Sequence, residues 1–255
     1  MNLNQLNAFS ASNPCAQNYV DVMGTESESY LADYKLFVGE RYLAGLSPEG
    51  NFNIYGHELQ DLEQALGLLL NEKGGWPDLI IGDNRLHPLI EKSQQKVTRY
   101  NPYYSMRLEN PTSDNPTTTR QVVAGDQEII NFWYENFNRD ENSSWSTPNV
   151  AELAGSKLYL LEDSGEFLGG CANTLVNESR LWIGRLYILP HLRRKGHGHD
   201  IMGHIENTAS AAGQSVDLLV NIANESAVSF YKKRGYQILS ENAFWCLEGS
   251  ERIPG

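Results

Sequence analysis

Residues 186–206 read LYILPHLRRKGHGHDIMGHIE, and this stretch decides the fold. It opens on four apolar residues typical of a strand, and Pro190 ends that strand because proline cannot donate to a β-ladder. Apolar residues then recur on one side of a helix that begins near residue 197. A strand followed by a glycine-rich turn and a helix points the free N–H groups of the first helical turn outward, which makes a site for anions. Pyrophosphate is the commonest small-molecule fit to such a site.

The turn carries the residues that a phosphate site needs. Gly196 and Gly198 let the backbone approach a phosphate closely, because neither has a Cβ. Arg193, Arg194 and Lys195 add positive charge beside the positive end of the helix dipole. The spacing Arg-x-x-Gly-x-Gly is neither the GxxxxGK[ST] of a Walker loop nor the GxGxxG of a dinucleotide fold. The alternative, that the two glycines merely end a loop, is disfavoured by the flanking strand and helix.

The strand, turn and helix together resemble the GNAT superfamily of N-acetyltransferases, whose acetyl-CoA motif is [Arg/Gln]-x-x-Gly-x-[Gly/Ala] at the start of a helix. A second block, VNIANESAVSFYKKRGYQI at 220–238, is similar to the family's second CoA-contacting region. In that region an Asn precedes a helix that bears a Tyr and ends in Gly-[Phe/Tyr]. The resemblance covers residues 116–255. It implies an α/β fold, the GNAT fold, with a central, mixed but mostly antiparallel sheet flanked by helices.

The hydrophobic pattern of this second half predicts the order of elements that the resemblance implies. Alternating or continuous apolar runs predict strands, and apolar residues at i, i+3 and i+4 predict helices. Strands are expected at 119–125, 157–163, 167–176, 180–189, 216–222, 236–239 and 243–249, and helices at 127–137, near 149–154, at 197–212 and at 225–235. Gly184 interrupts the strand at 180–189. The last strand, with Phe244, Trp245 and Cys246, is expected to be exposed and suited to pairing.

The first half repeats part of this order. Strands are expected at 34–40, 41–47, 51–56 and 78–83, and helices at 57–72 and 84–96. The stretch LENPTSDNPTTT at 108–119 lacks apolar periodicity and indicates a linker. Residues 1–115 are therefore interpreted as a degenerate GNAT-like domain and residues 116–255 as the acetyltransferase domain. Because His57 and Glu58 stand where a phosphate-binding turn is needed, the first half is expected to be a scaffold or pocket wall without acetyl-CoA.

The resemblance assigns contacts with acetyl-CoA, the implied cosubstrate, residue by residue. Backbone groups of Ile188 and Leu189 would hydrogen-bond the pantetheine arm, and Arg193 would shape the turn. The amides that would hold the pyrophosphate belong to Arg194, Lys195, Gly196, His197, Gly198 and His199. Asn224 would contact the pantetheine or cap the following helix. The cations at 232–234 are an ordinary solvated run or, as an alternative, contact the 3'-phosphate of CoA.

The implied chemistry is direct attack of an amine on the thioester. Tyr231 stands where many family members keep a tyrosine that protonates the departing CoA thiolate, and the alternative is a core tyrosine. An ordinary phenol, with a pKa of about 10, is close in basicity to a thiolate. Many members carry a Glu base on the fourth strand, where this chain has Gly184 and Arg185, so a water relay or another base is expected. The nearby carboxylates are interpreted as solvated surface groups, namely Glu135, Glu141, Glu162 and Glu178.

Composition limits the classes of function. The formal net charge of −12 argues against nucleic-acid binding, which depends on clustered Lys and Arg. No apolar run approaches the roughly 20 residues of a membrane span, and the N-terminus lacks the features of a secretory signal. The three cysteines are isolated, which favours a reducing compartment, so a cytoplasmic protein is expected. Four histidines are candidate metal ligands, namely His191, His197, His199 and His204. They have no partnering Cys or carboxylate motif, so no metal site is expected.

Two functions of different class remain. The first is an acetyl-CoA-dependent N-acetyltransferase acting on a primary amine of a small molecule or a peptide, with transfer of a longer acyl group as a variant. The second is a noncatalytic acyl-CoA-binding regulatory module, which the missing strand-four Glu permits. The loop at 138–150 and the first half are expected to line the acceptor pocket, and neither identifies the acceptor. A monomer or a homodimer is expected.

Overall fold

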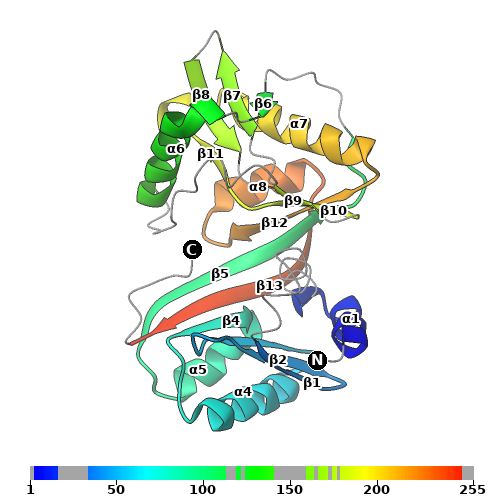
Figure 1. Ribbon diagram of the computed structural model, residues 1–255, viewed down its shortest axis with the longest axis vertical. Coiled ribbons are helices and arrows are strands. Elements are labelled where there is room, and N and C mark those ends of the chain that lie inside the picture. Colours follow the sequence, from blue (N-terminus) through cyan, green and yellow to red (C-terminus); the bar gives the residue numbers. More distant parts are fainter. Residues whose placement is uncertain are drawn as a thin grey trace. The chain divides into compact units, whose positions relative to one another are not determined.

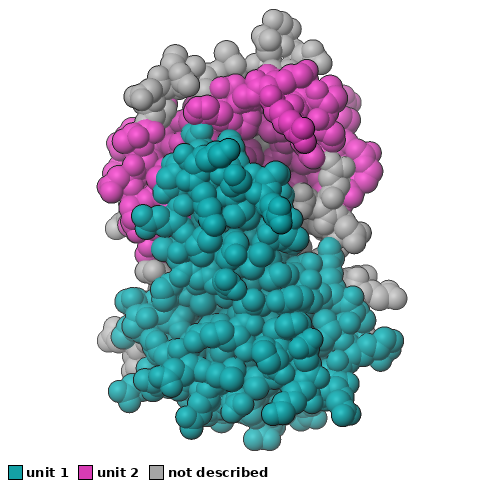
Figure 2. Space-filling model, turned by 180° about the vertical axis from the view of Figure 1, so that it is seen from behind, with its two compact units in different colours: residues 1–106, 219–251 teal, residues 107–218, 252–255 magenta. Residues whose placement is uncertain are grey.

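The computed structural model describes residues 3–16, 34–112, 119–121, 124–140, 159–163, 166–171, 174–176 and 179–248 (Figure 1). These stretches form an α/β fold with a large mixed sheet flanked by helices, as the sequence predicts. The chain divides into two compact units, which Figure 2 colours separately. Unit 1 comprises residues 1–106 and 219–251, and unit 2 comprises residues 107–218 and 252–255.

Both units contain helices and strands. The helices of the described ranges are α1 (Leu3–Ser12), α4 (Leu59–Lys73), α5 (His87–Lys92), α6 (Gln127–Asp140), α7 (His197–Ala211) and α8 (Glu225–Lys233), with 3-10 turns η1 (Asn84–Leu86), η2 (Ala124–Asp126) and η4 (Pro190–Leu192). The strands are β1 (Lys35–Val38), β2 (Tyr42–Leu46), β3 (Phe52–Gly56), β4 (Leu79–Asp83), β5 (Val97–Leu108), β6 (Thr119–Gln121), β7 (Tyr159–Asp163), β8 (Glu166–Cys171), β9 (Thr174–Val176), β10 (Arg180–Ile183), β11 (Leu186–Ile188), β12 (Ser215–Asn221) and β13 (Gln237–Leu247). None of these helices is long and apolar enough to cross a membrane.

Unit 1 is built on a mixed sheet in which β1, β2, β3, β4, β13 and β5 lie side by side in that order. The first three strands form an antiparallel meander, and the crossover through α4 makes β4 parallel to β3. Gly82 on β4 must be a glycine, because a Cβ there would lie 2.1 Å from the backbone oxygen of Ile54 on β3. The backbones of the two parallel strands therefore approach each other closely.

The core of unit 1 lies between this sheet and α4. The helix buries its apolar face against the sheet, through Leu62, Ala65, Leu66 and Leu69. The sheet meets it with Phe52, Ile54, Ile80 and Trp245. The spacing i, i+3, i+4 and i+7 is the one that the sequence predicts for an amphipathic helix. Burying one such large apolar side chain contributes about 1.5–3 kcal/mol, so this layer stabilises the unit.

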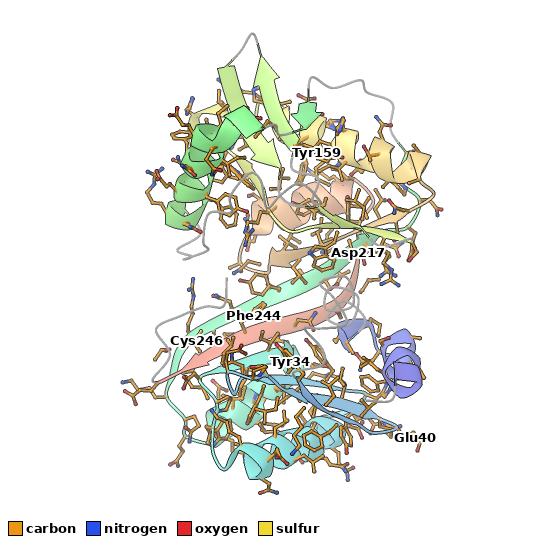
Figure 3. The ribbon with its side chains drawn as sticks, viewed as in Figure 1. Tyr34, Glu40, Tyr159, Asp217, Phe244 and Cys246 are labelled. Carbon is orange, nitrogen blue, oxygen red and sulfur yellow. The ribbon has the colours of Figure 1, made fainter. Side chains whose placement is uncertain are left out.

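The strand β13 comes from the far end of the chain and completes the sheet of unit 1, with Phe244 and Cys246 labelled in Figure 3. It pairs antiparallel with β4, where Phe244 lies opposite Ile81, and Trp245 is buried. Two predictions about this segment are wrong. The strands expected at 236–239 and 243–249 are one continuous strand, and it is not an exposed edge. Its backbone groups are satisfied because β4 and β5 flank it on both sides.

Unit 2 contains an antiparallel sheet with the strand order β11-β8-β7-β6. The helix α6 contacts β8, and α7 contacts β7, β8 and β11. Outside this sheet, β10 pairs antiparallel with β9 and parallel with β12. The strand predicted at 180–189 is therefore two strands in different sheets, separated at Gly184 and Arg185. The predicted interruption at Gly184 is the point where the chain passes from one sheet to the other.

Four segments differ from the sequence predictions. The 12-residue strand β5 has no predicted counterpart, and it runs into the start of the predicted linker. The helix α1 is also unpredicted. The helix expected at 84–96 ends earlier, at Lys92, because Gln94 takes a left-handed backbone conformation with a φ of 61°. The strand expected at 167–176 is two strands, β8 and β9, which belong to different sheets. The other predicted elements are confirmed within a few residues, apart from the helix near 149–154, which lies outside the described residues.

The compact units divide the chain differently from the predicted domains. Residues 219–251 belong to unit 1, although the predicted boundary assigns them to the second domain. The strands β5 and β12 each continue from one unit into the other. The predicted division into residues 1–115 and 116–255, and the repeat relationship between the two halves, stay predictions.

Candidate functional site

The glycine-rich turn lies in unit 2, between η4 and α7. Arg194 and Gly196 both adopt left-handed backbone conformations, with φ of 64° and 95°. A Cβ at Gly196 would meet nothing within 4 Å. The backbone conformation, and not a lack of space, therefore favours glycine at this position.

The N-terminus of α7 has no side-chain cap. The amides of His199 and Asp200 both donate to Gly196 O, at 2.7 and 3.1 Å. The amides of His197 and Gly198 belong to the first-turn groups that a helix does not satisfy by itself. The preceding cations, Arg193, Arg194 and Lys195, are exposed. Uncapped amides, the helix dipole and these cations together favour a bound anion.

Arg193 ties the turn to the end of β11. Its Nε donates to Ile188 O at 2.9 Å, and its guanidinium carbon lies 5.3 Å from the ring centre of Tyr187. Leu189 is buried, and its carbonyl accepts from Leu192 N at 2.9 Å. These contacts give the predicted shaping role of Arg193 a geometric basis.

The helix that follows the first parallel strand of unit 1, α4, has the opposite charge at its N-terminus. Oδ2 of Asp61 accepts from Glu58 N at 2.8 Å, and the Glu58 carboxylate pairs with Arg41 at 2.8 Å. Carboxylates thus stand where a phosphate oxygen would bind at an uncapped helix. The N-termini of α4 and α7 therefore suit ligands of opposite charge.

Asn224 and Tyr231 lie in unit 1, at the start of α8 and within it. Oδ1 of Asn224 accepts from Ala227 N at 3.2 Å, so of its two predicted roles the structure shows the helix cap. Tyr231 is 7% exposed, and the rings of Phe230 and Tyr236 meet it edge-on, with centroids 5.3 and 5.5 Å away. This burial suits the alternative of a core tyrosine, and the proton-donor role stays a prediction.

Arg185 and Tyr134 form a pair that the sequence does not predict. Arg185 lies in the break between β10 and β11, and its Nη1 donates to the Tyr134 hydroxyl at 3.0 Å. The guanidinium carbon lies 5.2 Å from the centre of the Tyr134 ring. Burial lowers the pKa of Arg185 and raises the pKa of Tyr134. A cation paired with a phenol therefore occupies the position at which the sequence resemblance would imply a carboxylate.

Those of the remaining predicted candidates that the structure describes do not gather into a second site. Glu135 is exposed, while Glu141, Glu178 and the side chain of Glu162 lie outside the described part of the chain. The ring of His204 meets that of Tyr159 edge-on with centroids 4.6 Å apart, and burial lowers the pKa of this histidine. Among the described residues, no group of three or more His, Cys, Asp and Glu side chains is placed to hold a metal ion.

Comparison with known proteins finds a family match to part of the chain. Residues 128–236 match the acetyltransferase (GNAT) family. The chain is 38% identical over 65 residues to N-alpha-acetyltransferase 50 of Danio rerio, covering 25% of this chain and 39% of that protein. It is 27% identical over 126 residues to the uncharacterized N-acetyltransferase YjcF of Bacillus subtilis, covering 48% of this chain and 88% of the relative. The first match thus spans less than half of the zebrafish protein.

A solved structure shares the fold over nearly the whole chain. The GCN5-related N-acetyltransferase from Kribbella flavida superposes with a TM-score of 0.55 at 11% identity, over 91% of this chain and 96% of that one. The solved structure supports the fold, and the matched part of the chain is similar to N-acetyltransferases. The matched part, residues 128–236, lies within residues 116–255, for which the sequence resemblance to the GNAT superfamily is predicted.

Proposed function

We propose that the protein is an acetyl-CoA-dependent N-acetyltransferase that acts on a primary amine of a small molecule or a peptide. The observation that carries this proposal is the uncapped N-terminus of α7, with Gly196 in a left-handed conformation and three cations before it. The family match supports acetyl transfer in general. The turn supports CoA as the acetyl carrier, because pyrophosphate is an anion that such a turn binds.

Each proposed contact with acetyl-CoA has a stated chemical role. The backbone amides of residues 194–199 bind the pyrophosphate, and Arg193 keeps the turn against β11. Backbone groups of Ile188 and Leu189 hydrogen-bond the pantetheine arm. Asn224 orders the start of α8 through its cap. The bound cosubstrate supplies an acetyl group activated as a thioester.

The proposed reaction is direct transfer. The amine nitrogen attacks the thioester carbonyl carbon, the new C–N bond forms, and the C–S bond breaks. The amine loses one proton, and the departing thiolate takes up one proton, for which Tyr231 is the proposed donor. Arg185 does not serve as the base, because a guanidinium keeps its proton at neutral pH. The proton of the amine therefore leaves through a water relay or to a base elsewhere. Positioning with a polarised carbonyl supplies most of the rate.

The proposal also covers the acceptor amine, the cellular location and the oligomeric state. The zebrafish relative is named an N-alpha-acetyltransferase, which supports including the α-amino group of a peptide among the acceptors. A cytoplasmic location rests on the isolated cysteines, of which Cys15 and Cys246 are free thiols. A monomer or a homodimer is proposed, with no nucleic acid or membrane as partner.

Titration calorimetry with acetyl-CoA tests the placement of the cofactor. The wild type is expected to bind, and Gly198→Trp is expected to lose binding because the indole fills the space of the pyrophosphate. Gly75→Trp is the matched control, because Gly75 follows α4 and has nothing within 4 Å of its Cβ position. Binding that persists in Gly198→Trp would show that the pyrophosphate lies elsewhere.

Thiol release measured with a panel of amines and peptides tests turnover. Release of CoA that depends on one class of amine supports the enzyme and identifies the acceptor class. Binding of acetyl-CoA without release on any acceptor favours the noncatalytic acyl-CoA-binding module. The family's fourth strand often carries a Glu base, and this chain has Arg185 there. This difference is the feature that keeps the second function open.

A further inference from the structure

Unit 1 contains a cavity of about 580 Å³ at the carboxyl ends of its two parallel strands, β3 and β4. Ligands of α/β sheets bind in crevices outside the carboxyl ends of parallel strands. The volume lies within the range of small-molecule sites, about 300–1,000 Å³. None of the residues proposed to contact acetyl-CoA lines this cavity.

One wall of the cavity is a packed segment that follows α1. Nδ2 of Asn13 donates to Gly56 O at 2.9 Å, and Sγ of Cys15 donates to Glu241 O at 3.7 Å. The helix α1 itself is anchored by Leu6 and Phe9, which are buried in a cluster with residues of β2 and β3. Burial raises the pKa of Cys15 to about 12, so its thiol stays protonated and serves as a donor. The wall is therefore held by specific contacts.

The guanidinium of Arg85, which lines the cavity, already donates hydrogen bonds to protein acceptors. Its Nε and Nη2 donate to the two carboxylate oxygens of Asp83, which is 2% exposed. Its Nη1 donates to His57 O at 2.8 Å, and Nη2 also donates to Gly56 O at 2.7 Å. These bonds use four of the five N–H groups of a guanidinium. An anionic ligand would gain little from a cation that a buried carboxylate neutralises.

Hydrogen-bond acceptors and one negative charge remain. Glu241 on β13 is exposed, and its Oε2 has a long contact, 3.4 Å, with Nδ2 of Asn84. Oδ1 of Asn84 accepts from the Tyr100 hydroxyl at 2.7 Å. Of the two carboxylates that line the cavity, Asp83 is paired with Arg85 and Glu241 is not. The unpaired carboxylate favours a ligand that brings N–H donors and a positive charge.

We propose that this cavity binds a small aliphatic amine in its ammonium form. The ammonium group donates to the Glu241 carboxylate beside Asn84, and the carbon chain lies against the apolar lining formed by Pro14, Pro88 and Leu239. This pairing neutralises the one uncompensated carboxylate of the lining and covers apolar wall at the same time. The lining shares no residue with the proposed acetyl-CoA contacts, so the proposal does not rest on the proposed function.

Ligand-observed NMR on the full chain without acetyl-CoA tests the proposal, with n-butylammonium as the probe and butyrate as its anionic counterpart. Butylammonium is expected to bind and butyrate is not. Glu241→Gln keeps the shape of the side chain but removes its charge, and it is expected to weaken butylammonium binding about tenfold. Glu63→Gln makes the same charge change on the exposed face of α4 and is expected to have no effect.

A second variant separates this cavity from any other amine site. Ser12 lines the cavity at the end of α1 and is exposed, with its Oγ 3.4 Å from Nε2 of His57. Ser12→Phe is expected to fill the entrance and abolish binding while the protein stays folded. Butylammonium binding that persists in both Glu241→Gln and Ser12→Phe, or equal binding of butyrate, would overturn the proposal. Neither variant alters residues proposed to hold acetyl-CoA, so this outcome would leave the proposed function standing.

Discussion

Arg107 and Asp217 form a buried two-point ion pair in unit 2. Nε and Nη2 of Arg107 donate to Oδ1 and Oδ2 of Asp217, at 2.7 and 2.8 Å. Their side chains are 10% and 2% exposed, and Asp217 is labelled on β12 in Figure 3. The hydrogen bonds to Asp217 raise the pKa of Arg107. Because two parallel hydrogen bonds join the charges, removing one partner leaves the other charge buried and unsatisfied.

Arg107→Met is therefore expected to lower the free energy of unfolding by about 3 kcal/mol. This value is at the low end of the usual cost of breaking a buried ion pair. The reason is that Nη1 of Arg180, 3.9 Å from Oδ2 of Asp217, still faces the carboxylate. Urea denaturation at pH 7 measures the change. Lys35→Met breaks the exposed pair of Lys35 with Glu72 and is expected to cost below about 1 kcal/mol. Equal losses in the two variants would contradict the importance given to burial.

Two glycines with open space around them are expected to respond to alanine in opposite ways. A Cβ at Gly196 or at Gly67 meets nothing within 4 Å, but only Gly196 has a positive φ, of 95°. Gly196→Ala is expected to destabilise the protein by about 1 kcal/mol and to weaken acetyl-CoA binding. Gly67→Ala, inside α4, is expected to stabilise by about 0.5–1 kcal/mol. Thermal unfolding and acetyl-CoA titration check both, and a stabilised Gly196→Ala would refute the conformational argument.

The elements around the glycine-rich turn could be predicted because their signals are local. The apolar run before Pro190, the left-handed glycine and the one-sided helix α7 are all written within neighbouring residues. The strand β5 could not be predicted, because Pro102 lies in its middle and proline in a central strand argues against one. Its carbonyl still accepts from Ile222 N at 3.0 Å. The position of β13 depends on a partner, β4, far away in the sequence, and periodicity does not identify partners.

In the candidate site, too, the local features could be predicted from the sequence and the tertiary contacts could not. The turn at 193–199 was predictable from spacing and charge, and Asn224 from its place before a helix. The pair of Arg185 and Tyr134 was not, because it joins α6 to the break after β10 through a tertiary contact. Tyr134 is buried beside Trp133 on α6. Its place in a helix with an apolar face was the signal that the sequence contained. Polar side chains inside an apolar helix face therefore merit attention as possible partners of buried charges.

Tyr231→Phe tests the proton donor. Loss of the hydroxyl is expected to lower kcat by about a hundredfold, because the thiolate then leaves without a positioned acid. The affinity for acetyl-CoA is expected to stay unchanged, because the ring and its packing remain. Tyr236→Phe is the control, since Tyr236 is 3% exposed and meets Tyr231 edge-on in the same aromatic cluster. Steady-state kinetics and cofactor titration measure both quantities, and an equal fall in kcat for the two variants would assign Tyr231 a packing role.

His204 is expected to make stability depend on pH. Burial lowers its pKa below the ordinary value of 6.5, so the unfolded chain binds the proton more readily than the folded one. The contribution of the neutral His204 to the free energy of unfolding is therefore present above pH 6.5 and is lost as the pH falls below that value. His204→Phe keeps an aromatic ring against Tyr159 but cannot titrate, and it is expected to lose less stability than the wild type between pH 6.5 and 5. Urea midpoints across this range measure the difference, with the exposed His191→Phe as control. A wild-type slope in His204→Phe would mean that other groups set the pH dependence.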